Sequence, residues 1–146
     1  MASTGVRTDP FLAFRFELRV FGLSIGQFSE CSGLELETEV LEYQEGGENT
    51  FVHKLPTRTK HTNIRLRRGI ADRSLWDWYF EVVQGTVRRR GGSVLVKDPS
   101  GAGDVAEWRF ADAFPAKWSG PELNATQNQV AIETVELCHH GLVRQR

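Results

Sequence analysis

The chain has 146 residues and a formal net charge of −1, with 40% hydrophobic and 25% charged residues. This length allows one domain with a real core, and the composition excludes a disordered chain. No apolar run approaches the ~20 residues of a transmembrane helix, and residues 1–10 lack the apolar stretch of a signal peptide. We therefore expect a single domain, residues 1–146, synthesised in the cytoplasm and without a membrane anchor.

The small net charge hides two blocks of opposite sign. Residues 27–52 contain seven glutamates and no Lys or Arg, whereas residues 53–90 contain ten Lys or Arg against three acidic residues. Such blocks can neutralise each other within one chain. They can also pair between copies, where complementary charge fixes partner and register. The sequence leaves both interpretations open.

The first predicted element follows a polar arm. Residues 1–10 are polar and end at Pro10, which predicts a flexible arm. Apolar and polar residues then alternate from Phe14 to Val20, which predicts a half-buried strand. Residues 22–26 predict a turn or a second short strand through Ile25.

The next stretch, residues 34–40, organises the rest of the pattern. Its even positions are apolar or Thr, and its odd positions are Glu35, Glu37 and Glu39. Because side chains alternate along a strand, we expect one face in the core and three like charges on the other. A solvated face is the ordinary interpretation of such glutamates. The alternative is a surface that faces a partner or a water-filled channel.

A long extended loop is predicted next. Residues 43–63 contain turn formers, Pro56 and mixed charge, but little periodicity. A loop of this length in a compact domain is usually functional, and no catalytic group accompanies it. We therefore expect the segment from Glu42 to Lys60 to act in assembly.

One helix is predicted, over residues 72–84, with Asp72 or Ser74 as its cap and Gly85 at its end. Trp76 and Trp78 are interpreted as packing residues and not as a cage for a cation. The expected apolar stripe consists of Leu75, Tyr79, Val82 and Val83, with Trp76 and Phe80 beside it.

The remaining pattern predicts further strands and turns. Residues 63–67 alternate as a strand with an arginine face, and residues 105–110 and 130–138 are two more strands. Val87 and residues 93–97 predict a hairpin or meander. The predicted connections are a turn over residues 98–101 and a proline-bounded segment over residues 114–121. With about seven strands and one helix, the expected fold class is mainly β.

The sequence offers no catalytic constellation. No serine or cysteine lies in a nucleophile motif, and we interpret Cys31 and Cys138 as reduced, buried thiols. His139 and His140 are adjacent, so in a strand they face opposite ways and cannot share one metal ion. We therefore expect no enzyme activity, no metal and no cofactor.

Two arginine clusters are the main candidates for binding chemistry, Arg65 with Arg67 and Arg68, and residues 88–90. They could form a phosphate-binding patch, which makes a nucleic-acid-binding β-barrel module the alternative function. The total charge is not basic, and no stacking aromatics are interleaved with the arginines. Pairing with carboxylates of the same or a neighbouring copy is therefore favoured.

A series of short motifs resembles the tail tube proteins of contractile phages and phage-tail-like contractile injection systems. The motifs are Asp9-Pro10-Phe11, residues 28–34 (FSECSGL), Glu42-Tyr43 with Gly46-Gly47, Lys54-Leu55-Pro56, residues 64–69 (IRLRRG), 75–78 (LWDW), 113–118 (AFPAKW), Asn124-Ala125 and 130–133 (VAIE). Each motif is weak alone, but their order over residues 9–142 is specific. The arginine-rich middle and the His139-His140-Gly141 ending look nearer to injection-system tubes than to type VI secretion tube proteins.

The resemblance implies two packed antiparallel sheets that close into a small β-barrel, with one flanking helix and a long extended loop. It also implies homohexameric rings stacked into a hollow tube, inside a contractile sheath and joined to baseplate or tube-initiator proteins. The lumen of such a tube carries protein or DNA cargo. The assembled particle is a phage tail or an injection system, whose ejected tube reaches the target envelope.

We place the subunit interface on the two charge blocks and the loop between them. Stacked rings bring two different faces together, and blocks of opposite charge suit that contact. The candidate interface residues are Glu35, Glu37, Glu39, Glu42, Tyr43, Gly46, Gly47, Lys54, Arg58, Arg88, Arg89 and Arg90.

Overall fold

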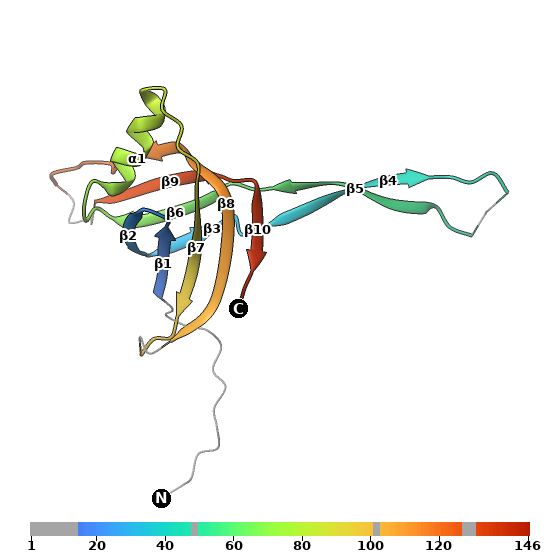
Figure 1. Ribbon diagram of the computed structural model, residues 1–146, viewed down its shortest axis with the longest axis horizontal. Helices are drawn as coiled ribbons and strands as arrows, with labels where there is room; N and C mark the ends of the chain where they lie inside the picture. The colour runs from blue at the N-terminus through green and yellow to red at the C-terminus, as the bar shows by residue number, and fades with distance from the viewer. Residues whose placement is uncertain (1–14, 48–49, 101–102, 127–130) are drawn as a thin grey trace, which may run out of the picture.

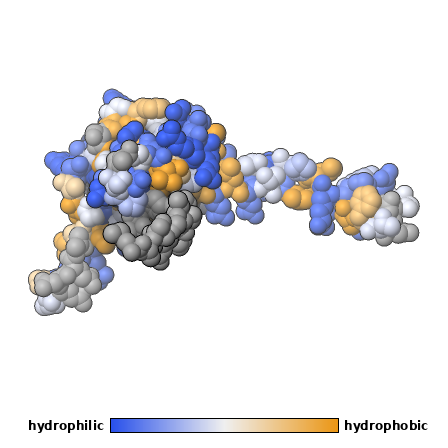
Figure 2. Space-filling model, turned by 90° about the horizontal axis from the view of Figure 1, so that it is seen from below, coloured by the Kyte–Doolittle hydropathy of each residue, from blue (hydrophilic) through white to orange (hydrophobic). Residues whose placement is uncertain are grey.

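The computed structural model describes residues 15–47, 50–100, 103–126 and 131–146, which form ten strands and one helix (Figure 1). The predicted arm over residues 1–10 lies outside the described residues. The fold is mainly β, as predicted. It has two parts, a curled sheet with the helix beside it and a two-stranded hairpin that projects from it (Figures 1 and 2).

Eight strands form one antiparallel sheet, in the order β2-β1-β7-β8-β9-β6-β3, with β10 paired to β8. Their bounds are β1 Arg15–Val20, β2 Leu23–Phe28, β3 Glu30–Ser32, β6 Ile64–Gly69, β7 Arg90–Lys97, β8 Asp104–Ser119, β9 Ile132–Cys138 and β10 Gly141–Arg144. The two ends of this order, β2 and β3, are separated by Ser29 alone. Within the described ranges no strand pairing closes the sheet, so the expected closed barrel is not found.

The sheet curls because β8 belongs to two ladders. Its first part pairs with β7, and its last part, from Phe114, pairs with β9. At the change of partner, Asp112 has a φ of +52°, and a register shift lies beside Pro115, which has no amide hydrogen to donate. The prediction of a connection over residues 114–121 is therefore wrong, because a bulge admits proline into a strand.

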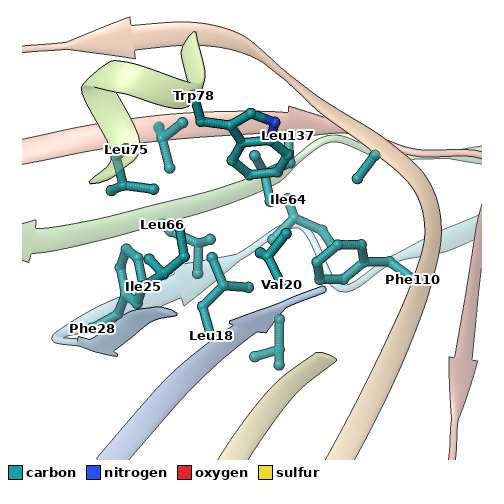
Figure 3. Close-up of a cluster of buried hydrophobic side chains, with 13 residues drawn as sticks. Leu18, Val20, Ile25, Phe28, Ile64, Leu66, Leu75, Trp78, Phe110 and Leu137 are labelled. Atoms are coloured by element: carbon teal, nitrogen blue, oxygen red, sulfur yellow. The ribbon is translucent and has the colours of Figure 1, made fainter. Parts of the chain in front are cut away.

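The core lies inside the curl and under the helix (Figure 3). The alternation predicted for β1 is confirmed, since Leu18 and Val20 are buried and Arg19 is exposed. The rest of the buried apolar cluster comes from β2, β6, α1, β7, β8 and β9: Ile25, Phe28, Ile64, Leu66, Leu75, Trp78, Val94, Phe110, Ala113, Val135 and Leu137.

The helix α1, Ser74–Val83, begins two residues later than predicted. Asp72 accepts hydrogen bonds from the amide and the hydroxyl of Ser74, at 2.9 and 2.6 Å, just ahead of the helix. The predicted stripe is partly wrong. Leu75 and Trp78 are buried, whereas Val83 is 59% exposed, because the sheet lies under the Leu75–Trp78 side of the helix.

The aromatic residues of the helix pack within the protein. Trp76 stacks on Phe80, with ring centroids 5.5 Å apart, and meets the edge of Trp118 at 4.8 Å. These contacts fit the interpretation of Trp76 and Trp78 as packing residues. After the helix, Val87 is not in a strand, since β7 begins at Arg90, and this part of the prediction is wrong.

The predicted loop over residues 43–63 is a strand for half its length. β4 Leu36–Tyr43 and β5 His53–His61 form an antiparallel hairpin, and residues 44–52 connect them. Pro56 and the mixed charge concealed β5 in the sequence, and a two-stranded sheet tolerates both because each strand has an open edge. The expected burial of one β4 face is also wrong, since Leu36 and Val40 are 51% and 56% exposed.

Candidate subunit interface

The projecting hairpin carries nine of the twelve candidate interface residues. Glu35 precedes β4, residues 37–43 supply four more, and Gly46 and Gly47 lie in the connection at the tip. Lys54 and Arg58 lie on β5. The structure does not bring residues 88–90 onto the hairpin, because they lie between α1 and the start of β7. The sequence candidates thus fall on two separate parts of the molecule.

Both faces of the hairpin are apolar in its middle. Leu41 is opposite Leu55, and the next pair, Val40 opposite Pro56, points to the other face. Leu41, Leu55 and Val40 are 53%, 48% and 56% exposed. A hairpin of two strands without a packed face is marginal in water, so this one has apolar area available for a partner on each side.

Aromatic residues extend the apolar surface toward the tip. Tyr43 and Phe51 are 54% and 55% exposed, and both rings lie beside His53, at 6.4 and 4.9 Å between centroids. His53 Nε2 lies 3.1 Å from a carboxylate oxygen of Glu45. Sequence reasoning chose Tyr43 but missed Phe51, Leu41 and Leu55. Apolar or aromatic residues recur at every second position at 41 and 43 and again at 51, 53 and 55, and this alternation was the available signal.

Several charges of the hairpin are matched within it. Glu37 is opposite Lys60 and Glu42 is opposite Lys54 in the ladder. Lys60 Nζ lies 2.7 Å from a carboxylate oxygen of Glu39, and the hydrogen bond and charge of Glu39 raise the pKa of Lys60. The acidic block and the first part of the basic block therefore meet inside one subunit, which is one of the two arrangements that the sequence allowed.

The arginine triplet is also largely engaged in its own subunit. Arg90 donates to the Phe21 carbonyl at 2.9 Å. Arg89 lies 3.1 Å from His140 Nε2 and stacks over the Phe114 ring at 4.9 Å. Arg88 is exposed, and no ion pair among the described residues includes it. Only Arg88 keeps its guanidinium free for a partner.

The arginines around residues 65–68 pair with carboxylates of their own subunit, as the sequence favoured, and do not form the alternative phosphate patch. Arg65 and Arg67 face outward, near Glu136 and Glu30 at 4.0 and 3.2 Å. Arg68 is only 3% exposed and donates to the buried Glu133 at 2.7 Å. It also donates to the Ile25 carbonyl and to Asp72, while Glu133 accepts from the Trp118 indole at 3.1 Å. Arg68 therefore joins sheet and helix and is not available to phosphate.

Groups for catalysis or metal binding are sparse in the described part of the chain. No three His, Cys, Asp or Glu residues gather there as metal ligands. Burial raises the pKa of Cys31 to about 11, so its thiol stays protonated and a poor nucleophile at neutral pH. No helix there is long and apolar enough to cross a bilayer. The surface that stands out is the hairpin.

Comparison with known proteins covers nearly the whole chain. The family model of the T4-like virus tail tube protein gp19 matches residues 12–143. No curated protein sequence matches the chain. A chain of an extracellular contractile injection system, the PVC sheath–tube complex in its extended state, is 27% identical, with a TM-score of 0.81, covering 93% of this chain and 91% of that one.

Two further structures extend the likeness. A chain of the PVC sheath/tube terminator is 26% identical, with a TM-score of 0.83, covering 97% of this chain and 100% of that one. Hcp1 from Flavobacterium johnsoniae, 16% identical over 90% of this chain and 95% of its own, shares the fold with a TM-score of 0.56. The family match spans both the body and the hairpin, and the chain therefore belongs to the T4-like virus tail tube protein family.

Proposed function

We propose that the protein is the tube subunit of a contractile injection system or phage tail, and that six copies form a ring. Stacked rings then make a hollow conduit for protein or DNA cargo. The observation that carries this proposal is the likeness to a chain of a sheath–tube complex over 93% of this chain and 91% of that one. The family model of the tail tube protein, which matches residues 12–143, supports the same proposal.

The hairpin is the proposed assembly element. Its apolar middle is exposed on both faces, and no buried side chain of the core comes from β4 or β5. Burial of apolar area contributes ~25 cal/mol per Å², so covering Leu41, Leu55 and Val40 favours association. A neighbouring subunit is the occupant that the tube proposal provides, and closing β4 or β5 against it would also remove an open strand edge.

The partners beyond the tube are a sheath and a baseplate. The similar chains come from structures described as a sheath–tube complex and a sheath/tube terminator, which supports the same surroundings for this subunit. The proposed particle is made in the cytoplasm and delivers its tube to a target envelope. Function is mechanical, and the proposal assigns no catalytic residue.

Charge has a narrower role than the sequence suggested. Lys60, Arg89 and Arg90 have partners in their own subunit, so they are poorly placed to attract a neighbour. Among the candidate residues, Glu35, Arg58 and Arg88 are exposed and have no opposite charge as a cross-strand partner in the described structure. We assign these three to pairing between copies, where they set register more than affinity, with the exposed cross-strand pairs of the hairpin beside them.

Electron microscopy of the purified full chain tests the proposal directly. At high protein concentration and low salt, negatively stained samples should contain six-fold rings with a central hole, or tubes, and sedimentation should give a ring mass. Only monomers, with no ring even after baseplate partners are added, would overturn it. Salt-sensitive binding of the monomer to a random oligonucleotide would then favour the nucleic-acid-binding module.

Deletion of residues 46–49 tests the hairpin separately. The subunit should keep a normal thermal transition, because Gly46 and Gly47 are exposed in the connection between β4 and β5 and contribute nothing to the core, while ring or tube formation falls. Arg88→Glu tests the charge assignment against Arg88→Gln. The reversal should weaken assembly at low salt more than neutralisation does, and screening should reduce that difference at high salt. Unchanged assembly in all three variants would exclude both assignments.

A further inference from the structure

The root of the hairpin consists of residues 33–35, before β4, and residues 62–63, after β5. These two segments cross in close contact. Gly33, with a φ of +85°, passes so close to the Asn63 carbonyl that a Cβ would collide with it. Thr62 lies between β5 and β6 and bonds through its amide to the Glu35 carbonyl at 3.4 Å. Cys138 donates to the Asn63 side chain at 3.3 Å. The direction of the hairpin is therefore set by a few contacts at its base.

A buried histidine completes this crossing. His139 is 7% exposed, and its Nε2 lies 3.0 Å from the Thr62 carbonyl oxygen at the hairpin root. Its Nδ1 lies 3.1 Å from the Gly141 carbonyl oxygen at the start of β10. Both ring nitrogens thus face acceptors. A neutral imidazole has one N–H donor, and only the protonated ring has two, so the neutral form leaves a lone pair against a carbonyl.

The adjacent histidine has the opposite surroundings. His140 Nε2 lies 3.1 Å from Arg89 Nη1, which can only donate, so the ring must accept there. Its Nδ1 lies 3.8 Å from a carboxylate oxygen of Asp112. Nε2 is therefore placed to accept and Nδ1 is placed to donate, which suits a neutral imidazole. The two neighbouring histidines therefore have different hydrogen-bonding partners, and of the two His139 is the one that contacts Thr62 at the hairpin root.

The charged and titratable groups that face the pair are few in the described part of the molecule. His61, at the end of β5, lies 5.5 Å from His139 between ring centroids, and its own protonation would repel a His139 cation. Arg89 and Asp112 face His140 from the segment before β7 and from β8. No ion pair of the described residues includes His139, so backbone carbonyls are what stabilise its charge.

We propose that His139 is a proton-dependent latch at the hairpin root. When the ring is protonated it bridges Thr62 on the hairpin side to Gly141 on the β10 side. When it is neutral, one of the two bonds is lost and the root is looser. The latch is therefore closed when the ring carries both protons and open when it carries one, and acid favours the closed form. Its effect on tube assembly rests on the proposed function; the latch itself does not.

The ring state of the wild-type protein is the primary test. Nitrogen-15 spectra of the full chain, in solution or in the solid state if it assembles, should show protons on both nitrogens of His139 at pH 5.5 and on one at pH 8. His140 provides the internal reference. A His139 ring that stays neutral at pH 5.5 would overturn the proposal, whether or not rings form.

Hydrogen exchange at the root tests the consequence. After correction for intrinsic rates, protection of the Thr62 amide should fall about tenfold from pH 5.5 to pH 8, the size expected for losing one charge-assisted bond. His139→Gln should remove this pH dependence, and the matched control His140→Gln should keep it. Equal pH dependence in all three proteins would exclude the latch. If His139→Gln fails to fold by circular dichroism, the ring spectra decide.

Discussion

The body and the hairpin of this protein differ in what covers the apolar faces of their strands. The body buries them within the subunit, whereas the hairpin leaves them exposed. In the body, the curled sheet buries Leu18, Leu66 and Leu137 in one apolar core, each at 1% exposure or less. In the hairpin, Leu41 and Leu55 form an equally apolar pair but remain about half exposed. The same residue types are core in one region and free surface in the other. Apolar alternation therefore identifies a strand face that is suited to burial. It does not tell whether the same subunit buries that face.

The polar groups of the two regions differ in the same way. The body encloses a buried ion pair, Arg68 with Glu133, whose remaining hydrogen bonds go to Ile25, Asp72, Ser74 and Trp118. The hairpin matches Glu39 with Lys60 at its surface, where the two side chains are 43% and 61% exposed. Removal of one partner is severe where water cannot replace it and mild where water can. The body should therefore carry the stability of the subunit, and the hairpin should carry its association.

The largest effect is expected from breaking the buried pair. Glu133→Ala leaves the Arg68 guanidinium buried beside one exposed carboxylate, and should lower the free energy of unfolding by ~3–5 kcal/mol. Glu136→Ala is the matched control on the same strand, since its pair with Arg65 is 4.0 Å long and reaches solvent, with the two side chains 28% and 56% exposed, and should cost below about 1 kcal/mol. Urea unfolding measures both, and equal losses would contradict the account of the body.

A slightly smaller effect is expected from the helix contact. Leu75 is fully buried, so Leu75→Ala should cost ~2–5 kcal/mol in urea unfolding, depending on how far the cavity collapses. Val83→Ala on the same helix changes a side chain that is 59% exposed and should stay within about 0.5 kcal/mol. A neutral Leu75→Ala would mean that the helix does not brace the sheet.

The hairpin should show the reverse balance. Replacing Leu41 and Leu55 together by Ser should change the subunit's free energy of unfolding by about 1 kcal/mol or less, because the lost cross-strand pair is exposed. Ring or tube yield, scored by sedimentation, should nevertheless fall sharply. The double replacement by Met keeps the apolar area and should keep assembly. Loss of stability without loss of assembly would show that the hairpin contributes to the stability of the subunit, as the body does, and not to its association.

The smallest effect is expected on the pH dependence of the subunit's free energy of unfolding, through Asp72. Hydrogen bonds from the Ser74 hydroxyl and amide, with Arg68 adding to them, hold the pKa of Asp72 below its usual value. This contribution to stability is present above the ordinary aspartate pKa of ~4 and is lost as pH falls below it. The stability difference between wild type and Asp72→Asn should therefore shrink from pH 7 to pH 2.5. Ser74→Ala should weaken that pH dependence, and an unchanged slope would show that the contact is not formed in solution.

Local alternation predicted much of the body. β1, β6 and β9 were recognised because residues such as Leu18, Ile64 and Val135 recur every second position against a single core. The helix was placed to within two residues. What failed was the long strand β8, where Pro115 looked like a connection, and β5, where Pro56 and mixed charge looked like a loop. In both strands, a register shift lies next to the proline and lets it remain in a ladder that would otherwise exclude it.

Most of the candidate interface residues lie on the projecting hairpin, but their partners differ from those that the sequence suggested. The glutamates and the glycines at the tip do belong to the projecting element, and so do Tyr43, Lys54 and Arg58. The partners of the charges were not predictable, because Lys60 reaches Glu39 through a hairpin that the sequence presented as a loop. Arg68 and Arg67 are neighbours in sequence with opposite environments, since adjacent residues of a strand point to opposite faces.

The family, the β-rich class and the residues able to be buried follow from the sequence, because they depend on local periodicity and on motif order along one chain. The folded subunit shows which apolar faces it covers and which charges it neutralises. It also brings His139 to Thr62 at the hairpin root, 77 residues away in the chain. Those outcomes depend on contacts between distant segments. A one-residue shift of register reverses which face a side chain takes, and no local pattern records it.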